Sequence, residues 1–291
     1  MTLIRVLRTV KTTLTRTFYL EEVATAATGN VVVTITRLDG TVVQTGNATV
    51  VGTLYSFVFN GSDTLDQLIV SWAATVAADA VVLDQDVLEV VGGFYFGLSE
   101  ARAIDPKFTN ATNFPTQTLI DRRNEVEDEA EVICEQAFVP RFARETLSGA
   151  GTSTLMLKHA LLRRARAITV DGVAFSQLSV DAFAADEVGV LRYNTAAANA
   201  GVWPPGVKNI VVEYEHGMDR APTAIVRGAK LRMKSLLLAV QSPMMDRAER
   251  VVTVDQSGGT VVYGSPGPGR TGIPETDAAY GKYPSPRPGF G

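Results

Sequence analysis

NIVVEYEHGMDRAPTAIVRGAKLRMKSLLLAV, residues 209–240, contains a strand, a glycine turn and a helix in immediate succession. Asn209–Tyr214 is rich in β-branched residues, which favour a strand. Pro222 suits a first helical position, and apolar side chains recur at helical spacing from Ile225 to Val240. Pro243 ends the helix, because proline cannot continue one. The stretch predicts a chain that mixes both kinds of secondary structure.

A second helix is expected upstream, from Pro115 to about Ala137. Its apolar residues Leu119, Val126 and Ala130 lie on one helical face, at spacings of seven and four. Short runs of β-forming residues between the two helices predict further strands. These strands are Leu155–Leu157, Arg166–Val170, Gly189–Tyr193 and Asn209–Tyr214.

Residues 1–96 have the pattern of strands throughout. The expected strands include Val31–Thr36, Tyr55–Phe59, Leu68–Trp72 and Val87–Val91. Asp39-Gly40 is a hairpin signal, because this pair readily adopts the positive φ angles of a tight turn. Short strands with regular turn signals predict a small β-sandwich, of which the immunoglobulin-like arrangement is one form. Trp72 is expected in its core rather than on a binding surface.

The composition changes at Ser257. From there to Gly291 the chain holds 9 glycines and 6 prolines, with little hydrophobic periodicity. Such a segment cannot bury enough apolar surface to offset the entropy of ordering it, so an extended arm is expected. Its aromatic residues are spaced anchors that could order it against a partner. They are Tyr263, Tyr280, Tyr283 and Phe290.

These patterns predict an α+β chain in three parts. Residues 1–96 form an all-β sandwich. Residues 97–245 form a small helical bundle with β-hairpins, and Gly92-Gly93 precedes the join between the two. Residues 246–291 form the extended Gly/Pro-rich arm.

The composition argues against several classes of function. The net charge of −4 gives no basic face for tight nucleic-acid binding. Cys134 is the only cysteine, and the two histidines, His159 and His216, belong to no paired metal-ligand motif. No apolar run approaches the roughly 20 residues of a membrane span. We therefore expect a soluble protein that is not an enzyme and has no catalytic, metal or cofactor site.

The two helices differ in charge. The 115–137 helix carries seven acids against two arginines, whereas the 222–240 helix carries four basic residues and no acid. Two interpretations stay open: the helices pair inside one subunit, or they form complementary faces of neighbouring subunits in a ring. The second interpretation makes these residues candidates for a subunit interface: Glu125, Asp128, Glu129, Arg227, Lys230 and Lys234.

From about Leu98 to Val240, roughly half of the chain, the sequence resembles the head-to-tail adaptor (head-completion or connector) proteins of long-tailed bacteriophages. Three features carry the resemblance: an acidic helix entered through Thr112–Pro115, a strand ending in Val170–Val173, and Val211–Gly217 leading into Ala221-Pro222. The N-terminal β-domain departs from the minimal pattern of that family.

The resemblance implies a virion protein at the head–tail junction, assembled in the host cytoplasm. Such proteins form a ring, typically of about twelve subunits, around a lumen that passes DNA without sequence-specific binding. Their partners are the portal protein above, which a C-terminal extension grips, and the next neck, stopper or tail-terminator protein below. A lumen lined by acids of the 115–137 helix would repel the duplex and let it slide.

A different class of function fits residues 1–96. A β-sandwich can act as an adhesion or glycan-binding module, with the rest of the chain as its carrier. That alternative predicts a cleft with exposed aromatic side chains in this part of the chain.

Overall fold

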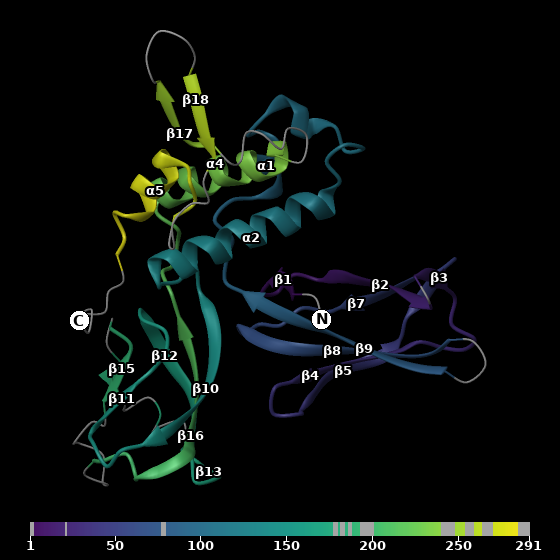
Figure 1. Cartoon of the computed structure of the whole chain (residues 1–291). Helices are drawn as coiled ribbons and strands as arrows, with labels where there is room; N and C mark the ends of the chain where they lie inside the picture. The colour runs from purple at the N-terminus through teal and green to yellow at the C-terminus, as the bar shows by residue number, and fades with distance from the viewer. Residues whose placement is uncertain are drawn as a thin grey trace.

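The computed structural model describes residues 3–20, 22–76, 80–176, 180, 184–185, 188–192, 201–239, 248–253, 259–263 and 270–284. Figure 1 shows a β-sandwich to one side, a layer of helices above, and a second β-structure below the helices. This is an α+β architecture, as the sequence predicts. No helix among the described residues is long and apolar enough to cross a membrane.

The first sheet of the sandwich has five strands. Val33, Ile35, Val70 and Trp72 alternate with more exposed residues and point inward, as expected for a sheet with one buried face. β1 runs parallel to β9, and the other neighbours are antiparallel. In spatial order the strands are β1 (Leu3–Leu7), β9 (Ala80–Val91), β8 (Asp66–Val76), β4 (Val32–Arg37) and β5 (Val42–Asn47).

The second sheet closes the sandwich. Its inward residues, among them Leu14, Phe18, Tyr55 and Phe59, form one hydrophobic cluster with those of the first sheet. Trp72 is fully buried in this cluster, which confirms its predicted core position. In spatial order the strands are β3 (Val23–Thr25), β2 (Thr12–Leu20), β7 (Leu54–Phe59) and β6 (Thr49–Val51).

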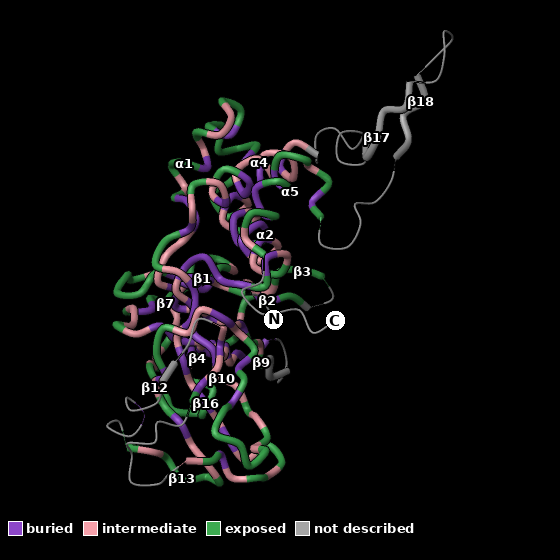
Figure 2. The backbone as a smooth tube through the Cα atoms, turned by 90° about the vertical axis from the view of Figure 1, so that its left-hand side faces the viewer, coloured by how far each residue is buried: buried purple, intermediate pink, exposed green. Residues whose placement is uncertain are grey.

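The helices pack around a second apolar core. Leu119, Val126 and Ala130 of the acidic helix meet Ile225 and its neighbours on the basic one. Figure 2 shows buried residues along both helices. The helices are α1 (Leu98–Arg102), the 3-10 turn η1 (Pro106–Thr109), α2 (Thr116–Cys134), α4 (Thr223–Ala239) and α5 (Pro274–Tyr280).

The strands below the helices form a four-stranded and a three-stranded sheet around a third core, which contains Trp203 and Tyr214. The four-stranded sheet runs β10 (Arg141–Gly149), β16 (Gly206–His216), β12 (Leu162–Val170) and β13 (Val173–Ala174). The other runs β11 (Thr154–Met156), β15 (Val190–Arg192) and β14 (Ala184–Ala185). A separate hairpin pairs β17 (Ala248–Thr253) with β18 (Gly259–Tyr263).

The C-terminal segment differs from the expected extended arm. Pro274–Tyr280 is helix α5, which packs against α4, and the Tyr280 side chain is only 2% exposed in the helical core. Tyr283 packs at the edge of this core, with its ring 5.7 Å from that of Phe138. Burial within the subunit therefore leaves Tyr280 no surface for a partner. Tyr263 is the last residue of β18, and Phe290 lies outside the described residues.

Candidate functional site

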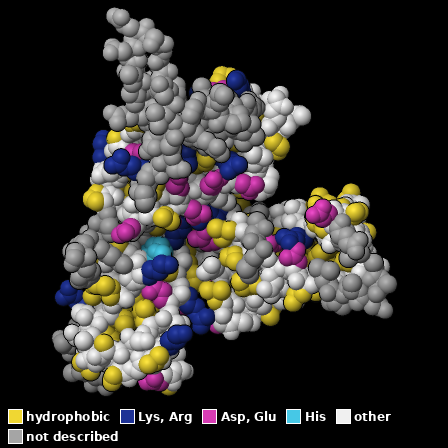
Figure 3. Space-filling model, in the orientation of Figure 1, with side chains coloured by type: hydrophobic (Ala, Val, Ile, Leu, Met, Phe, Trp, Pro, Cys, Tyr) yellow, Lys and Arg dark blue, Asp and Glu magenta, His cyan; other side chains and the backbone are white. Residues whose placement is uncertain are grey.

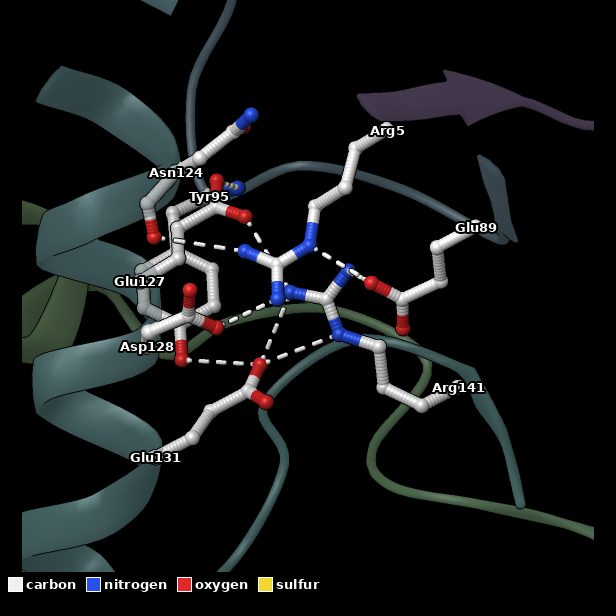
Figure 4. Close-up of polar contacts among 8 residues, drawn as sticks. All are labelled: Arg5, Glu89, Tyr95, Asn124, Glu127, Asp128, Glu131 and Arg141. Atoms are coloured by element: carbon white, nitrogen blue, oxygen red, sulfur yellow. Dashed lines mark hydrogen bonds and ion pairs between the residues drawn. The ribbon is translucent and has the colours of Figure 1, made fainter. Parts of the chain in front are cut away.

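The sandwich, helix α2 and strand β10 meet at a buried group of charged side chains, shown in Figure 4. We call this group the joint cluster. Helix α2 supplies three carboxylates, and each strand that reaches the helix supplies one charged side chain. Its members are Arg5 of β1, Glu89 of β9, Arg141 of β10, and Glu127, Asp128 and Glu131 of α2.

Regular secondary structure brings these side chains together. Glu127 and Glu131 are four residues apart in α2, so they project from the same face of the helix. Arg5 and Glu89 are direct cross-strand partners in the parallel pair of β1 and β9. Arg141 is the first residue of β10 and enters from the lower sheet. Each of the three parts thus contributes at least one charged residue to the joint.

Arg5 links the sandwich to α2. Its Nε donates to Glu89 Oε2 at 2.7 Å, and its Nη1 donates to the backbone oxygen of Asn124 at 3.2 Å. Its Nη2 pairs with the carboxylate of Asp128. A single guanidinium therefore contacts a neighbouring strand, a helix backbone and a helix side chain.

Arg141 links the lower sheet to the same helix. Its Nη2 donates to Glu131 Oε1 at 2.9 Å and to Glu127 Oε2 at 3.2 Å, and its Nε donates to Glu131 Oε1 at 3.1 Å. Glu127 also accepts from the backbone N–H of Tyr95 at 2.8 Å. Both Glu127 and Arg141 are almost fully buried, so these bonds take the place of the water that the charges have lost.

Burial and ion pairing act in opposite directions on the acids and bases of the joint cluster. Burial alone would lower the pKa of Arg141, but the carboxylates of Glu131, Glu89 and Glu127 outweigh it and raise that pKa. Burial raises the pKa of Glu127, and it raises the pKa of Glu131 to about 7 despite the attraction of Arg141. The guanidinium therefore stays charged, and Glu131 is the member of the pair that titrates near neutral pH.

Glu131 links folding stability to pH. Because its pKa rises from 4.5 to about 7 on folding, the folded chain holds this proton more tightly than the unfolded chain does. The free energy of unfolding should therefore fall, by on the order of 1–3 kcal/mol, as pH rises through that window. Urea unfolding at several pH values measures it. We expect Glu131→Gln to flatten this dependence of the free energy of unfolding on pH, and the exposed control Glu125→Gln to leave it unchanged. A free energy of unfolding that rises with pH over this window in the wild-type chain would contradict the prediction.

A second polar contact holds the sandwich against the lower sheet. Arg37 Nε donates to Asp66 Oδ2 at 3.0 Å within the sandwich. Arg144 of β10 donates to the backbone oxygen of Leu38 at 3.1 Å, and Arg166 of β12 donates to the backbone oxygen of Leu65. The sandwich is thus attached at two places, the joint cluster and this contact.

The charges of the two long helices are largely used inside the subunit. Glu129 pairs with Arg232 at 2.9 Å across the α2–α4 packing. Lys230 pairs with Glu100, and Lys234 with Asp105, both at 2.9 Å. The pair of Glu129 with Arg232 joins the two helices within one chain, whereas Lys230 and Lys234 pair with residues outside α2.

The remaining candidates for a subunit interface are divided between internal pairs and free surface. Asp128 pairs with Arg5, and Glu125 pairs with Arg122 three residues before it in α2. Arg227 is exposed on α4. Two acids of α2 face inward, because Glu127 is buried and Glu131 is mostly buried in the joint cluster, whereas Asp121 and Glu125 are exposed.

Arg5 and Arg141 were not among the sequence-predicted site residues. Each lies in a short strand-like run, and its partners are far away in sequence, with a separation of 123 residues between Arg5 and Asp128. The one available signal was the excess of acid on α2, since several carboxylates on one helix need cations from elsewhere.

The described residues contain no group of three His, Cys, Asp or Glu side chains that could hold a metal ion. Cys134 is buried, and burial raises the pKa of its thiol to about 12, so it is a poor nucleophile. His159 and His216 stack with ring centroids 4.2 Å apart and the ring planes at 13°. Burial lowers the pKa of His216 to about 2, so its ring is neutral.

No protein-family model matches the chain, and no curated protein matches its sequence. The chain is similar to solved structures of gene transfer agent (GTA) particles at 11% sequence identity. One is described as the virion of the native GTA particle, with a TM-score of 0.44. Another is the neck of the empty GTA particle computed with C6 symmetry, with a TM-score of 0.40. Each match covers 68% of this chain and 93% of the other.

Proposed function

We propose that the chain is a structural virion protein: a ring-forming adaptor that joins the portal vertex of a phage capsid to the neck or tail. Its partners would be further copies of itself, the portal protein, and the next neck, stopper or tail-terminator protein. DNA would pass through the lumen of the ring. This role is mechanical and requires no catalytic residue or cofactor.

One observation carries the proposal: the three segments that resemble the adaptor proteins belong to one continuous body. The acidic helix is α2, and it packs against α4. The strand that ends near Val170 is β12, and Val211–Gly217 is the end of β16 and the turn after it. β16 pairs with β12 on one side and β10 on the other, and it leads directly into α4.

The sandwich adds a surface suited to assembly. Residues 40–62 contain no charged side chain, and they include strands β5, β6 and β7. Val51, Leu54 and Val58 are among the exposed apolar residues of this region, and β6 is an edge strand of its sheet. Proteins that stay separate usually protect such edges with charges, so this uncharged face supports a role in contacts between proteins.

We further propose the divisions of the chain that this function implies. Residues 1–96 would be an accessory domain, 97–245 the adaptor core, and 246–291 a terminal region that contributes helix α5 to that core. The order β1-β9-β8-β4-β5 facing β3-β2-β7-β6 supports an immunoglobulin-like identity for the accessory domain.

Labelling intact particles tests the proposed location. The turn at Asp171-Gly172 is exposed, and a Cβ added at Gly172 would have no neighbouring atom within 4 Å, so the turn can accept a short peptide tag. We expect gold-labelled antibody against the tag to mark the head–tail junction of particles made by a host carrying the tagged gene, with untagged particles as control. Label confined to the capsid shell or the tail tip would overturn the proposal.

The adhesion or glycan-binding alternative has one feature in its favour. A hollow of about 520 Å³ in the sandwich is lined by Tyr19, Arg16 and Asp84 among others, and Tyr19 is 64% exposed. Arg16 is already paired with Asp84 and Asp86, which leaves fewer free polar groups for a sugar. Label at the tail tip in the experiment above would favour this alternative.

A further inference from the structure

The uncharged face of the sandwich ends in an open strand edge, which we call the β5–β6 edge. β5 is the outer strand of the first sheet and β6 the outer strand of the second, and among the described residues each pairs with one neighbouring strand only. Ala48 alone separates the two strands in the chain, so residues 42–51 border both sheets. Every second residue of an edge strand directs its N–H and C=O away from its one partner. The edge therefore offers backbone hydrogen bonds along one side of the sandwich.

Apolar side chains lie along this edge and beside it on β7. Val50 and Val51 of β6 are 54% and 82% exposed, and the cross-strand partner of Val51 is the exposed Leu54 of β7. Gln44 of β5 joins the same surface to β7, because its Nε2 donates to the backbone oxygen of Val58 at 2.8 Å. Figure 3 shows few charged side chains among the hydrophobic ones on the visible face of the sandwich. The apolar surface is thus continuous from β5 across β7 to β6.

The β5–β6 edge lacks the usual protection against strand pairing. Natural edge strands commonly carry charged side chains or proline, which prevent another strand from adding to the sheet. Residues 40–62 contain neither. The opposite edges of the two sheets do carry charge, since β1 contains Arg5 and β3 directly follows Glu22. The sandwich is therefore open to strand pairing at the β5–β6 edge in particular.

The absence of charge favours a second copy of the chain as the partner. A different protein is usually selected by opposite charge, and residues 42–51 have none to offer. A contact between two identical edges has to be self-complementary, and any charge close to its two-fold axis would face its own like. Two copies of β6 related by such an axis run antiparallel, which is the orientation of every strand pair within this sheet.

We infer that two copies of the chain join through their β5–β6 edges, with β6 of one copy paired antiparallel to β6 of the other. The second sheets of the two sandwiches then form one continuous sheet. The contact is small, below the roughly 1,200 Å² of a standard interface, so its Kd is expected at about 1–100 μM. The inference goes beyond the proposed function, because this dimer belongs to the free protein and the contacts that close a ring are head to tail.

Analytical ultracentrifugation of the purified full chain, over about 1–300 μM, tests the inference. We expect the mass to rise with concentration from 31.2 kDa towards twice that value. Val51→Lys should weaken the dimer at least about tenfold, because it places two like charges across one short strand pair. Val23→Lys is the matched control, since Val23 is 66% exposed on β3 at the opposite edge, and it should leave the dimer unchanged. Urea unfolding checks that each variant is folded.

Mixing two variants tests whether the edge meets its own copy. Val51→Glu alone should also stay a monomer, and a mixture of Val51→Glu with Val51→Lys should recover the dimer, because opposite charges then lie across the strand pair.

Three results would each overturn the inference. A wild-type chain that stays a monomer at every concentration would leave the edge to an extended strand of a different protein. An association unaffected by Val51→Lys would lie elsewhere on the chain. A mixture that stays monomeric would mean that β6 meets another surface of the second copy. None of these results depends on where the protein lies in a particle, so the labelling experiment for the proposed function stands apart from them.

Discussion

Arg141→Ala is expected to lower the free energy of unfolding by about 3–5 kcal/mol. The substitution removes the cation that Glu127 and Glu131 share, and it leaves the two carboxylates in the joint cluster with only the hydrogen bonds from Tyr95 in place of water. An uncompensated buried charge costs more than the original pair contributed, because the desolvation remains while the attraction is lost. Urea unfolding at pH 8, above the pKa of about 7 that Glu131 has beside Arg141, measures the loss.

Arg122→Ala is the matched control for this prediction. Arg122 pairs with Glu125 on the solvent side of the same helix, and their side chains are 34% and 47% exposed. Its loss should change stability by no more than about 1 kcal/mol. Similar losses for the two variants would mean that burial of the joint cluster does not determine its contribution.

Gly217→Ala is expected to cost about 3–4 kcal/mol, and it acts on the turn between β16 and α4. Gly217 has a φ of 97°, which is unfavourable for any residue with a side chain. A Cβ there would also lie 2.3 Å from the backbone oxygen of Val139, which cannot move as a side chain would. The strain and the steric clash add, so either the turn or the link between α2 and β10, where Val139 lies, must shift. Thermal and urea unfolding measure the loss.

Gly172→Ala separates the two causes. Gly172 has a similar positive φ of 78°, but a Cβ there would meet nothing within 4 Å. Its substitution should cost about 1 kcal/mol, the conformational part alone. If both alanine variants lost the same amount, contact with Val139 would not be the cause at Gly217.

The sequence predicted the regular elements well, because their signals are local. The runs around Val33 and Val70 became strands β4 and β8, and the two helices formed within a few residues of their expected bounds. The hairpin turn at Asp39-Gly40 also formed, with Gly40 at a φ of 88°. The alternation of apolar and polar residues, the β-branched residues and the turn-forming residues each act within about ten residues, and sequence patterns report structure over that range.

The joint cluster and the C-terminal helix could not be predicted in the same way. Charge counts along α2 do not reveal that Glu127 is buried, since its partner Arg141 comes from another part of the chain. For the C-terminal segment, average composition hid a seven-residue helix among glycines and prolines. Pro274 at its start and Glu275 in its first turn are helix-start signals that act over only a few residues, so an average over the whole segment conceals them.

The parallel pairing of β1 with β9 has a consequence for the order of folding. Arg5 meets Glu89 across 84 residues and Asp128 across 123, so this side chain of β1 has no complete set of partners until α2 has been made. Contacts of such long range form late, because the entropy of closing the loop comes first. The backbone of β1 can pair with β9 once Val91 has been made, but the ion pair of Arg5 with Asp128 has to wait for the helical layer.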